Sequence, residues 1–375
     1  CRFWRAWADR EVPGIDELPK DCQELFRQSL LVIRTQIDNG GAVIAANDTD
    51  IMKTNRATYS YMWPRDGALV SMVMDRVGFQ QLGRRFFEFC KRVLPSDRPV
   101  LMHKYGPDGS LGASWHPWVV DGRPEVPFQE DETALTLAAL WDHYHHHRDL
   151  EFLREMFDGF VVPTADFIIK YRDPATKLPL PSWDLWEERR GVHSFSVAAV
   201  WAALNACAHM ARALGDEREL LYRSSAEEVH HALLTYLVDP NNETFYRCLR
   251  VGDDGELVPD LTVDASVLGV VLLGAVAPHD PSAVATIDVV EAEPDRFRIV
   301  ALGAGAHVHA LAAQAERLRP ELVVVADPSR TAELRDLVPV GTRVEGGTEA
   351  LAAAATAADV TVNAVVGFAG LPVTM

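Results

Sequence analysis

The stretch VAAVWAALNACAHMARALG, Val197–Gly215, decides the fold of the larger part of this chain. Its apolar residues recur three and four positions apart, which is the spacing of one face of a helix. Gly215 closes the run, as glycine commonly does just after a helix. The same period recurs in two other segments: Leu82, Phe86, Phe89 and Val93, and Leu137, Leu140, Trp141 and Tyr144. The chain is therefore predicted to be mostly helical up to about residue 275.

The spacing of these helices predicts a toroid. Further helices are expected over residues 22–36, 67–77, 150–171, 219–238 and 262–274. Aromatic-rich and Pro-rich loops lie between them, over 95–130, 172–193 and 239–261. Helix pairs joined alternately by short turns and long loops are typical of an α/α toroid, with the long loops gathered around a pocket at one end.

The pattern changes near Ile287, and no Gly/Ser/Pro-rich linker marks the change. Arg298-Ile299-Val300-Ala301-Leu302 is predicted to be a buried strand, followed by Gly303-Ala304-Gly305. Short apolar strands then alternate with helices, which indicates βαβ units and a parallel sheet. The expected elements are helices 307–318, 329–337 and 348–357 and strands 322–326, 342–345 and 360–366. We expect two domains, residues 1–286 and 287–375.

Composition excludes several classes of partner. The net charge of −18 argues against nucleic acid and against an anionic membrane surface, because both need a basic face. We identify no apolar run near the ~20 residues that span a bilayer. The five cysteines are widely spaced and form no C-x-x-C, which favours reduced thiols and a cytoplasmic location. No signal peptide is apparent, and because the chain begins at Cys1 we expect its true start to lie upstream.

Two adjacent carboxylates follow a pair of indoles in Trp183-Asp184-Leu185-Trp186-Glu187-Glu188-Arg189. A carboxyl group between indoles is partly desolvated, which raises its pKa. A proton donor to a glycosidic oxygen needs that property. An ordinary acidic loop before a helix would have the same residues, because acids favour helix N-termini.

Two other segments favour the catalytic interpretation. Tyr59-Ser60-Tyr61-Met62-Trp63-Pro64-Arg65-Asp66 places a charged pair beside aromatic residues, and Phe128-Gln129-Glu130-Asp131-Glu132 adds polar groups at a helix start. Sugars bind such sets, because their apolar ring faces meet aromatic planes while their hydroxyls take hydrogen bonds from charged groups. We expect Trp115 and Trp118 to line the approach.

By these three motifs, in this order, residues 20–286 resemble glycoside hydrolase family 15, which contains glucoamylases, glucodextranases and some trehalases. The resemblance implies an (α/α)₆ barrel and hydrolysis of α-glucosides with inversion. It implies that Glu187 is the general acid and that Arg65 and Asp66 grip the terminal glucose. The full set of implied substrate-binding residues is Tyr59, Trp63, Arg65, Asp66, Gln129, Asp131, Trp186, Glu188 and Arg189.

The resemblance also implies a general base in the last third of the barrel, in helices that we do not identify here. We therefore expect an incomplete barrel with impaired hydrolysis. The residues do not distinguish maltodextrin, isomaltose-type and trehalose substrates, and they do not indicate an oligomeric state. The hydrolase itself is expected to need no cofactor.

Residues 287–375 resemble the NADPH-binding domain of 1-deoxy-D-xylulose 5-phosphate reductoisomerase. The matching segments include Val300-Ala301-Leu302-Gly303-Ala304-Gly305, Val325-Ala326-Asp327 and Ala364–Leu371. The resemblance implies that Gly303, Gly305 and Asp327 face the cofactor. The first strand and its phosphate-binding turn would precede Ile287, where the sequence is barrel-like instead, so we expect NADPH not to bind.

Three interpretations remain after these resemblances. The first is a family 15 hydrolase joined to an unrelated reductoisomerase segment. The second is an NADPH-dependent oxidoreductase, and the third is a carbohydrate-binding protein without turnover. The run His143, His145, His146 and His147 suggests a metal site, but adjacent helix positions point in different directions, so we expect none.

Overall fold

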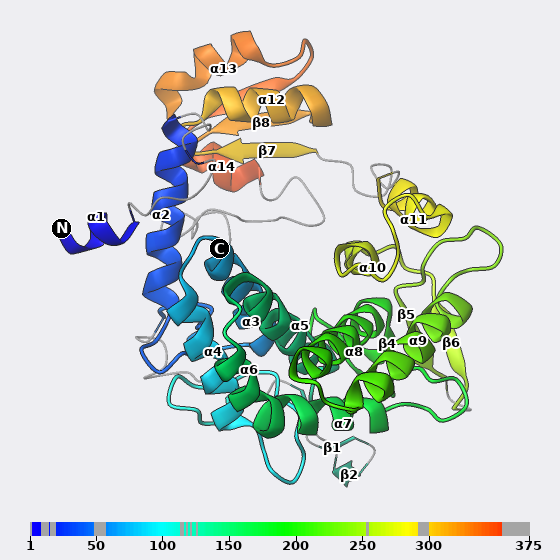
Figure 1. The fold of residues 1–375 in the computed structure, drawn as a ribbon. Coiled ribbons are helices and arrows are strands. Elements are labelled where there is room, and N and C mark those ends of the chain that lie inside the picture. Colours follow the sequence, from blue (N-terminus) through cyan, green and yellow to red (C-terminus); the bar gives the residue numbers. More distant parts are fainter. Residues whose placement is uncertain are drawn as a thin grey trace. The chain divides into compact units, whose positions relative to one another are not determined.

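The computed structural model describes residues 2–8, 15, 20–48, 58–112, 116–117, 119–120, 122–124, 127–252, 255–291 and 300–354. The chain divides into two compact units, Cys1–Val290 and Glu291–Met375 (Figure 1). The change of pattern seen in the sequence near Ile287 lies within the last helix of the first unit, α11 (Pro281–Glu291). Trp115, Trp118 and the strand predicted over 360–366 lie outside the described residues.

Three helices that are separate in the sequence form the centre of the first unit. They are α3 (Pro64–Arg76), α5 (Glu130–His147) and α8 (Ser194–Leu214), and each packs against the next. Two more helices pack outside them, α4 (Gln80–Val93) on α3 and α9 (Arg218–Tyr236) on α8 (Figure 1). This arrangement of inner and outer helices confirms the predicted incomplete α/α barrel.

The helix predicted over 150–171 is interrupted. It consists of α6 (Leu150–Met156), a π-helical turn (Phe157–Val161) and α7 (Val162–Lys170). Pro163 lies in the first turn of α7, where its missing N–H removes a bond to the preceding turn. The π turn is the local adjustment that lets the helix continue past this proline.

The helix predicted over 262–274 is wrong in length. Only a 3₁₀ turn (Ala265–Leu268) and the short helix α10 (Gly269–Leu272) form there. Gly274 adopts a positive φ of 80° just after α10, a conformation that ends a helix and that glycine tolerates. Two helices precede the toroid: α1 (Arg2–Ala8) and α2 (Lys20–Gln36).

Helix α8 corrects the expectation that no apolar segment approaches the length needed to span a bilayer. Its 21 residues are long and apolar enough to cross a membrane by length and composition. However, 72% of its most apolar window is buried inside the first unit, where α5 and α9 pack against it. Burial on nearly all sides by protein explains this composition, which is that of a core helix.

The loops that precede α3, α5 and α8 meet at one end of the helices. Met62, just before α3, forms a bridge with Tyr105, and the Trp183 N–H donates to the Phe128 carbonyl at 3.2 Å. A four-stranded antiparallel sheet continues from these loops in the order β3 (Ser182–Trp183), β4 (Arg190–His193), β5 (Cys248–Val251) and β6 (Leu257–Asp260). A separate pair, β1 (Val119–Val120) and β2 (Arg123–Pro124), is antiparallel.

The second unit is a small parallel sheet with helices on both faces. Its strands lie in the order β7 (Ala301–Ala304), β8 (Leu322–Val325) and β9 (Arg343–Gly346). Side chains of β8 alternate between two apolar clusters: Val323 and Val325 pack with α12 (Val308–Leu318) and α13 (Thr331–Leu337), whereas Leu322 and Val324 pack with α14 (Thr348–Ala354). This confirms the predicted partial Rossmann-like sheet, although its first described strand begins at Ala301 rather than Arg298.

Candidate functional site

The side chain of Arg65 joins the starts of α3 and α5. Its Nη1 donates to Gln129 Oε1 at 2.5 Å and to Asp131 Oδ2 at 2.9 Å. The Arg65 backbone N–H also donates to the Glu132 carboxylate, whose other oxygen lies 3.3 Å from Nη1. Arg65 is thus a cation that faces two of the fully buried acids in the first turn of α5, Asp131 and Glu132.

Glu187 lies within reach of both helix starts. Trp63 Nε1 donates to Glu187 Oε1 at 2.5 Å, and Gln129 Nε2 donates to the same oxygen at 3.1 Å. Trp63 is the residue before α3, and Gln129 is the residue before α5. The structure therefore brings three of the predicted site segments together on one carboxylate oxygen.

Asp184 shapes the loop that presents Glu187. Its Oδ1 accepts the backbone N–H groups of Glu188 at 2.8 Å and Arg189 at 3.0 Å, while its carbonyl accepts the Glu187 N–H at 3.0 Å. Glu187 itself has a φ of 62°, in the left-handed region that side chains other than glycine rarely adopt. A non-glycine residue in this region indicates a conformation held by its surroundings, as is common at functional sites.

Exposed aromatic rings lie beside this carboxylate. Tyr59 stacks on Trp63 with ring centroids 5.8 Å apart, and Tyr59 and Trp186 are 60% and 51% exposed. Asp66 extends toward solvent with its side chain 54% exposed, 3.7 Å from Arg65. Aromatic planes next to carboxylate oxygens form a surface suited to a sugar ring.

Sequence reasoning missed a basic group beside Glu187. Lys104 is fully buried, with its Nζ 5.0 Å from the centre of the Tyr61 ring and 5.2 Å from that of Trp63. His116 stacks on Trp183 at 4.1 Å, and His103 lies 5.5 Å from His116. The only signal in the sequence was the placement of these polar residues within an aromatic-rich loop.

Burial sets the charge of these groups. It lowers the pKa of Lys104 to about 8 and that of His103 to about 4, although the negative charge of Glu187 opposes both shifts. Burial also lowers the pKa of His116. Burial raises the pKa of Asp66, against the influence of Arg65. At neutral pH the two histidines are therefore neutral, and Lys104 is mainly cationic.

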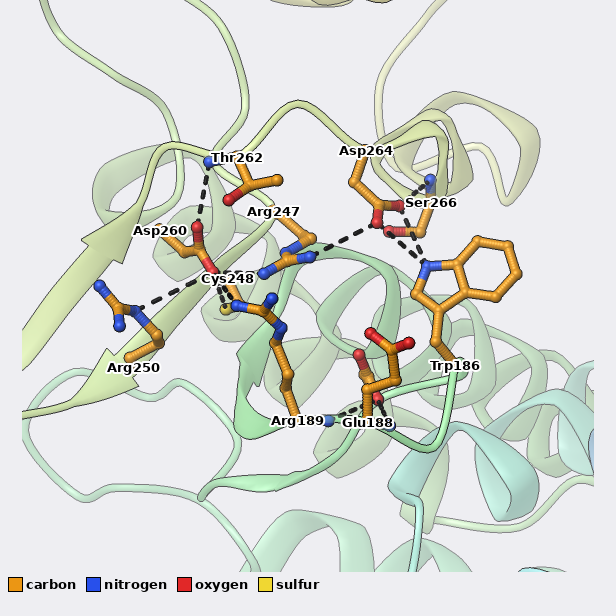
Figure 2. A network of polar contacts seen from close by, with 11 residues as sticks. Trp186, Glu188, Arg189, Arg247, Cys248, Arg250, Asp260, Thr262, Asp264 and Ser266 are labelled. Carbon is orange, nitrogen blue, oxygen red and sulfur yellow. Dashed lines mark hydrogen bonds and ion pairs between the residues drawn. The ribbon is translucent and has the colours of Figure 1, made fainter. Parts of the chain in front are cut away.

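A second polar network holds both sides of the Glu187-Glu188 pair (Figure 2). On one side, Trp186 Nε1 donates to both oxygens of Asp264 at 3.1 Å. On the other, Arg189 lies 3.5 Å from Asp260. The buried side chain of Arg247 lies between the two acids, bonded to Asp260 and 3.6 Å from Asp264. Arg247, the residue before β5, thus links both flanks of the loop to the end of β6 and to the turn after it.

The remaining predicted site residues occupy different surroundings. Asp131 is fully buried and bonded to Arg65, whereas Glu188 is exposed between Trp186 and Arg189 (Figure 2). Arg189 pairs with Asp260 rather than with either glutamate of the motif. Sequence patterns gave no indication that Asp260 and Asp264 hold this loop, because Arg189 and Trp186, which they contact, are more than 70 residues away along the chain.

In the second unit, the residues predicted to face a cofactor lie at the carboxyl ends of the strands. Gly305 follows β7, and its carbonyl accepts the Asp327 N–H at 3.1 Å. Gly303 lies within β7, where a Cβ would clash with Leu351. The Asp327 carboxylate caps the following 3₁₀ turn by accepting the Ser329 N–H at 3.0 Å and its hydroxyl at 2.7 Å.

Two protein families match the chain. Residues 24–306 match glycosyl hydrolases family 15, and residues 283–375 match 1-deoxy-D-xylulose 5-phosphate reductoisomerase. An uncharacterized glycosyl hydrolase of Methanocaldococcus jannaschii is 24% identical over 247 residues, which are 65% of this chain and 35% of that protein. The chain thus spans about a third of that relative. The reductoisomerase of Rhodospirillum centenum is 47% identical over 92 residues, 24% of this chain and 23% of that enzyme.

Solved structures share the fold of the first unit. A bacterial glucoamylase complexed with acarbose matches with a TM-score of 0.60 and 20% identity, over 80% of this chain and 43% of that one. A glycosidase in complex with glucose matches with a TM-score of 0.54 and 24% identity, over 70% of this chain and 67% of that one. At such identities the likeness establishes the fold alone.

Glu130 generates a prediction about stability. Burial raises its pKa well above the usual value, and neither carboxylate oxygen has a hydrogen-bond partner among the described residues. The folded protein keeps a proton that the unfolded chain releases near pH 4–5, so folding becomes less favourable as pH rises above that range. Glu130→Gln removes this titration and should raise the free energy of unfolding at pH 7, by more as the pH increases.

The measurement is chemical unfolding followed by tryptophan fluorescence at several pH values between about 5 and 8. All nine tryptophans precede residue 290, so the signal reports the first unit. Glu151→Gln, on an exposed glutamate in the first turn of α6, is the control and should change nothing. If Glu130→Gln raises the free energy of unfolding by the same amount at every pH, the prediction is contradicted.

The network around Arg247 generates a second prediction. Asp264→Ala removes the acceptor of the Trp186 indole and frees that flank of the loop. We expect a changed Trp186 emission, identified by comparison with Trp186→Phe, because the loss of the hydrogen bond exposes the indole N–H to water. Asp280→Ala is the matched control, because Asp280 also caps a helix through a serine two residues later but does not contact Trp186. If Asp264→Ala and Asp280→Ala change the Trp186 emission equally, the effect comes from the loss of a helix cap and not from the loss of the bond to Trp186.

Proposed function

The chain belongs to family 15 of the glycosyl hydrolases over residues 24–306, and from that premise we propose that its first unit binds the non-reducing end of an α-glucoside. The observation that carries the proposal is that Trp63 and Gln129, from two different helix starts, both donate hydrogen bonds to the same carboxylate oxygen of Glu187. Maltodextrins, isomaltose-type sugars and trehalose are the candidate substrates.

Glu187 is the proposed general acid. Trp63 and Gln129 hold its Oε1 through two N–H groups, which fixes the orientation of the carboxyl group. In the reaction, the bond from the anomeric carbon to the leaving oxygen breaks, and that oxygen takes the proton of Glu187. Water adds to the anomeric carbon from the opposite face and gives its proton to a second carboxylate.

The sugar itself is proposed to meet three kinds of group. Asp66 accepts hydrogen bonds from hydroxyls of the terminal ring, and its exposed carboxylate supports this role. Arg65 fixes Asp66 and the first turn of α5 from behind. The exposed rings of Tyr59 and Trp186 contact the apolar faces of sugar units. Glu188 and Arg189 are proposed to contact the substrate beyond the cleaved bond.

The base is the part of the reaction to which we assign no described residue. Inverting enzymes place the second carboxylate about 6.5–9.5 Å from the acid, with room for water between them. Glu130, Asp131 and Glu132 are unsuited to this role, because all three are fully buried in the first turn of α5. We therefore propose sugar binding with weak hydrolysis for residues 1–375.

The test compares Glu187→Gln with the parent chain. The variant keeps the shape of the side chain but carries no acidic proton, so it should bind maltose like the parent in a calorimetric titration. Glucose release from maltose, maltotriose and trehalose should be slow in the parent, because loss of a general base costs about 10²–10⁴ in rate. Whatever release is measurable should disappear in Glu187→Gln.

Glu243→Gln is the control for this experiment. Glu243 also has a positive φ, 61°, but it lies exposed in a distant turn, so its replacement should leave binding and release unchanged. If Glu187→Gln hydrolyses these sugars at the rate of the parent, Glu187 is not the general acid. If no α-glucoside binds to the parent, the proposed function itself is wrong. Rapid glucose release would instead identify a base elsewhere.

NADPH is the cofactor implied by the reductoisomerase match. The described residues fit it poorly: the last described element before the sheet is the helix α11 of the first unit, and no described residue before the sheet forms the first strand and phosphate-binding turn that the cofactor needs. The Asp327 carboxylate is also engaged with Ser329 and is negative, which disfavours a 2′-phosphate. No reaction step is assigned to the second unit.

The prediction is that NADPH binds this chain no more tightly than it binds an unrelated acidic protein. Isothermal titration with NADPH and with NADH measures this directly. Binding at micromolar concentration that Asp327→Ala alters would contradict the prediction and favour an oxidoreductase function for the second unit.

A further inference from the structure

Three metal-binding side chains meet where α3 packs against α5, away from the carboxylate site. Asp75 is the penultimate residue of α3, and His143 and His147 lie in the last part of α5. Residues four apart on a helix share one face, so both imidazoles face Asp75. Their ring centroids are 4.8 Å apart. The sequence did not reveal this site, because His143 and His147 stand in a run of histidines and Asp75 is on a different helix.

The donor atoms of these residues are close together and buried. His143 Nδ1 lies 2.9 Å from both oxygens of Asp75, and His147 Nε2 lies 3.0 Å from Oδ1. The side chains of Asp75 and His143 are 0% and 1% exposed, whereas that of His147 is 15% exposed. Solvent therefore reaches the cluster only along the His147 side.

Two imidazole nitrogens and a carboxylate oxygen form a donor set that zinc and other late first-row divalent ions prefer. All three donor atoms lie within 4.8 Å of one another. A tetrahedral zinc ion with bonds of about 2.0–2.1 Å separates two ligands by about 3.4 Å. The observed 2.9–3.0 Å spacings between the imidazole nitrogens and Asp75 are shorter than this, so these nitrogens move away from the carboxylate when an ion enters.

Charge favours an ion here. Asp75 is a fully buried carboxylate with no Lys or Arg in ion-pair distance among the described residues, and a buried charge needs a compensating partner. Gly83 of α4 faces the same atoms: a Cβ there would lie 2.7 Å from Asp75 Oδ1 and 3.1 Å from His143 Nδ1. Only glycine lets α4 approach the cluster this closely.

We propose that Asp75, His143 and His147 form a binding site for one divalent cation of the zinc class, with water as the fourth ligand. The ion joins the C-terminal ends of α3 and α5, whose opposite ends carry Arg65 and Asp131. It therefore stabilises the two helices that present the candidate sugar site. This proposal is independent of the proposed hydrolase function.

The test uses the full chain after dialysis against EDTA. Calorimetric titration with Zn²⁺ should show one tight equivalent, and zinc should raise the melting temperature followed by tryptophan fluorescence. Co²⁺ should give visible absorption bands typical of a tetrahedral site. His147→Ala, the least buried change, should weaken Zn²⁺ binding at least 100-fold and remove both the thermal shift and the cobalt bands.

The control is His145→Ala, in the same turn of α5 but exposed and outside the cluster. It should leave zinc binding unchanged. His147→Gln, which keeps much of the side-chain volume, replaces His147→Ala if that variant does not fold. Absence of stoichiometric zinc binding overturns the proposal and leaves a buried hydrogen-bonded triad. Zinc binding that survives both His147 variants, or that His145→Ala abolishes, overturns it as well.

Discussion

The first unit depends on one buried cation, Arg65. The first turn of α5 carries three consecutive acids, Glu130, Asp131 and Glu132, all fully buried, although charged groups rarely lie inside proteins without partners. The helix dipole favours them only modestly. Arg65 forms ion pairs with two of the three, Asp131 and Glu132, and its backbone N–H also donates to Glu132. Removing one partner of a buried ion pair typically costs about 3–5 kcal/mol, so α3 and α5 are fixed to each other at this end.

The fixed position of Arg65 also determines which groups contact Glu187. Because Arg65 fixes Gln129 at the start of α5, the Gln129 amide reaches Glu187, and Trp63 reaches the same oxygen from the start of α3. The loop that carries Glu187 adds its own rigidity. Its left-handed φ is maintained by Asp184 within the loop and by Arg247 through the acids on each flank. A carboxylate fixed in this way is pre-organised to deliver a proton in one direction.

The two units differ in how their cores form. In the first, helices pair through broad apolar faces, and the aromatic and acidic residues collect in the loops at one end. In the second, the four residues of β8 alternate between two helical layers, so a short strand defines both faces of the sheet. Alternation of this kind follows from the pleat of a strand and needs few residues. This explains how a small segment forms a recognisable parallel sheet.

The sequence by itself determined the fold class, because hydrophobic periodicity is local: the spacing of Val197–Leu214 and the apolar strand Leu322–Val325 each specify their element without distant partners. It also determined the motifs, and it indicated that Trp63, Gln129 and Glu187 belong to one site. Only the tertiary structure decided which groups touch. The bonds of Trp186 to Asp264 and of His143 to Asp75 join residues about 70 positions apart, and no local pattern encodes such a distance. The interrupted helix at Pro163 and the short α10 show the same limit, since backbone hydrogen bonding and close packing overrode the helical period there.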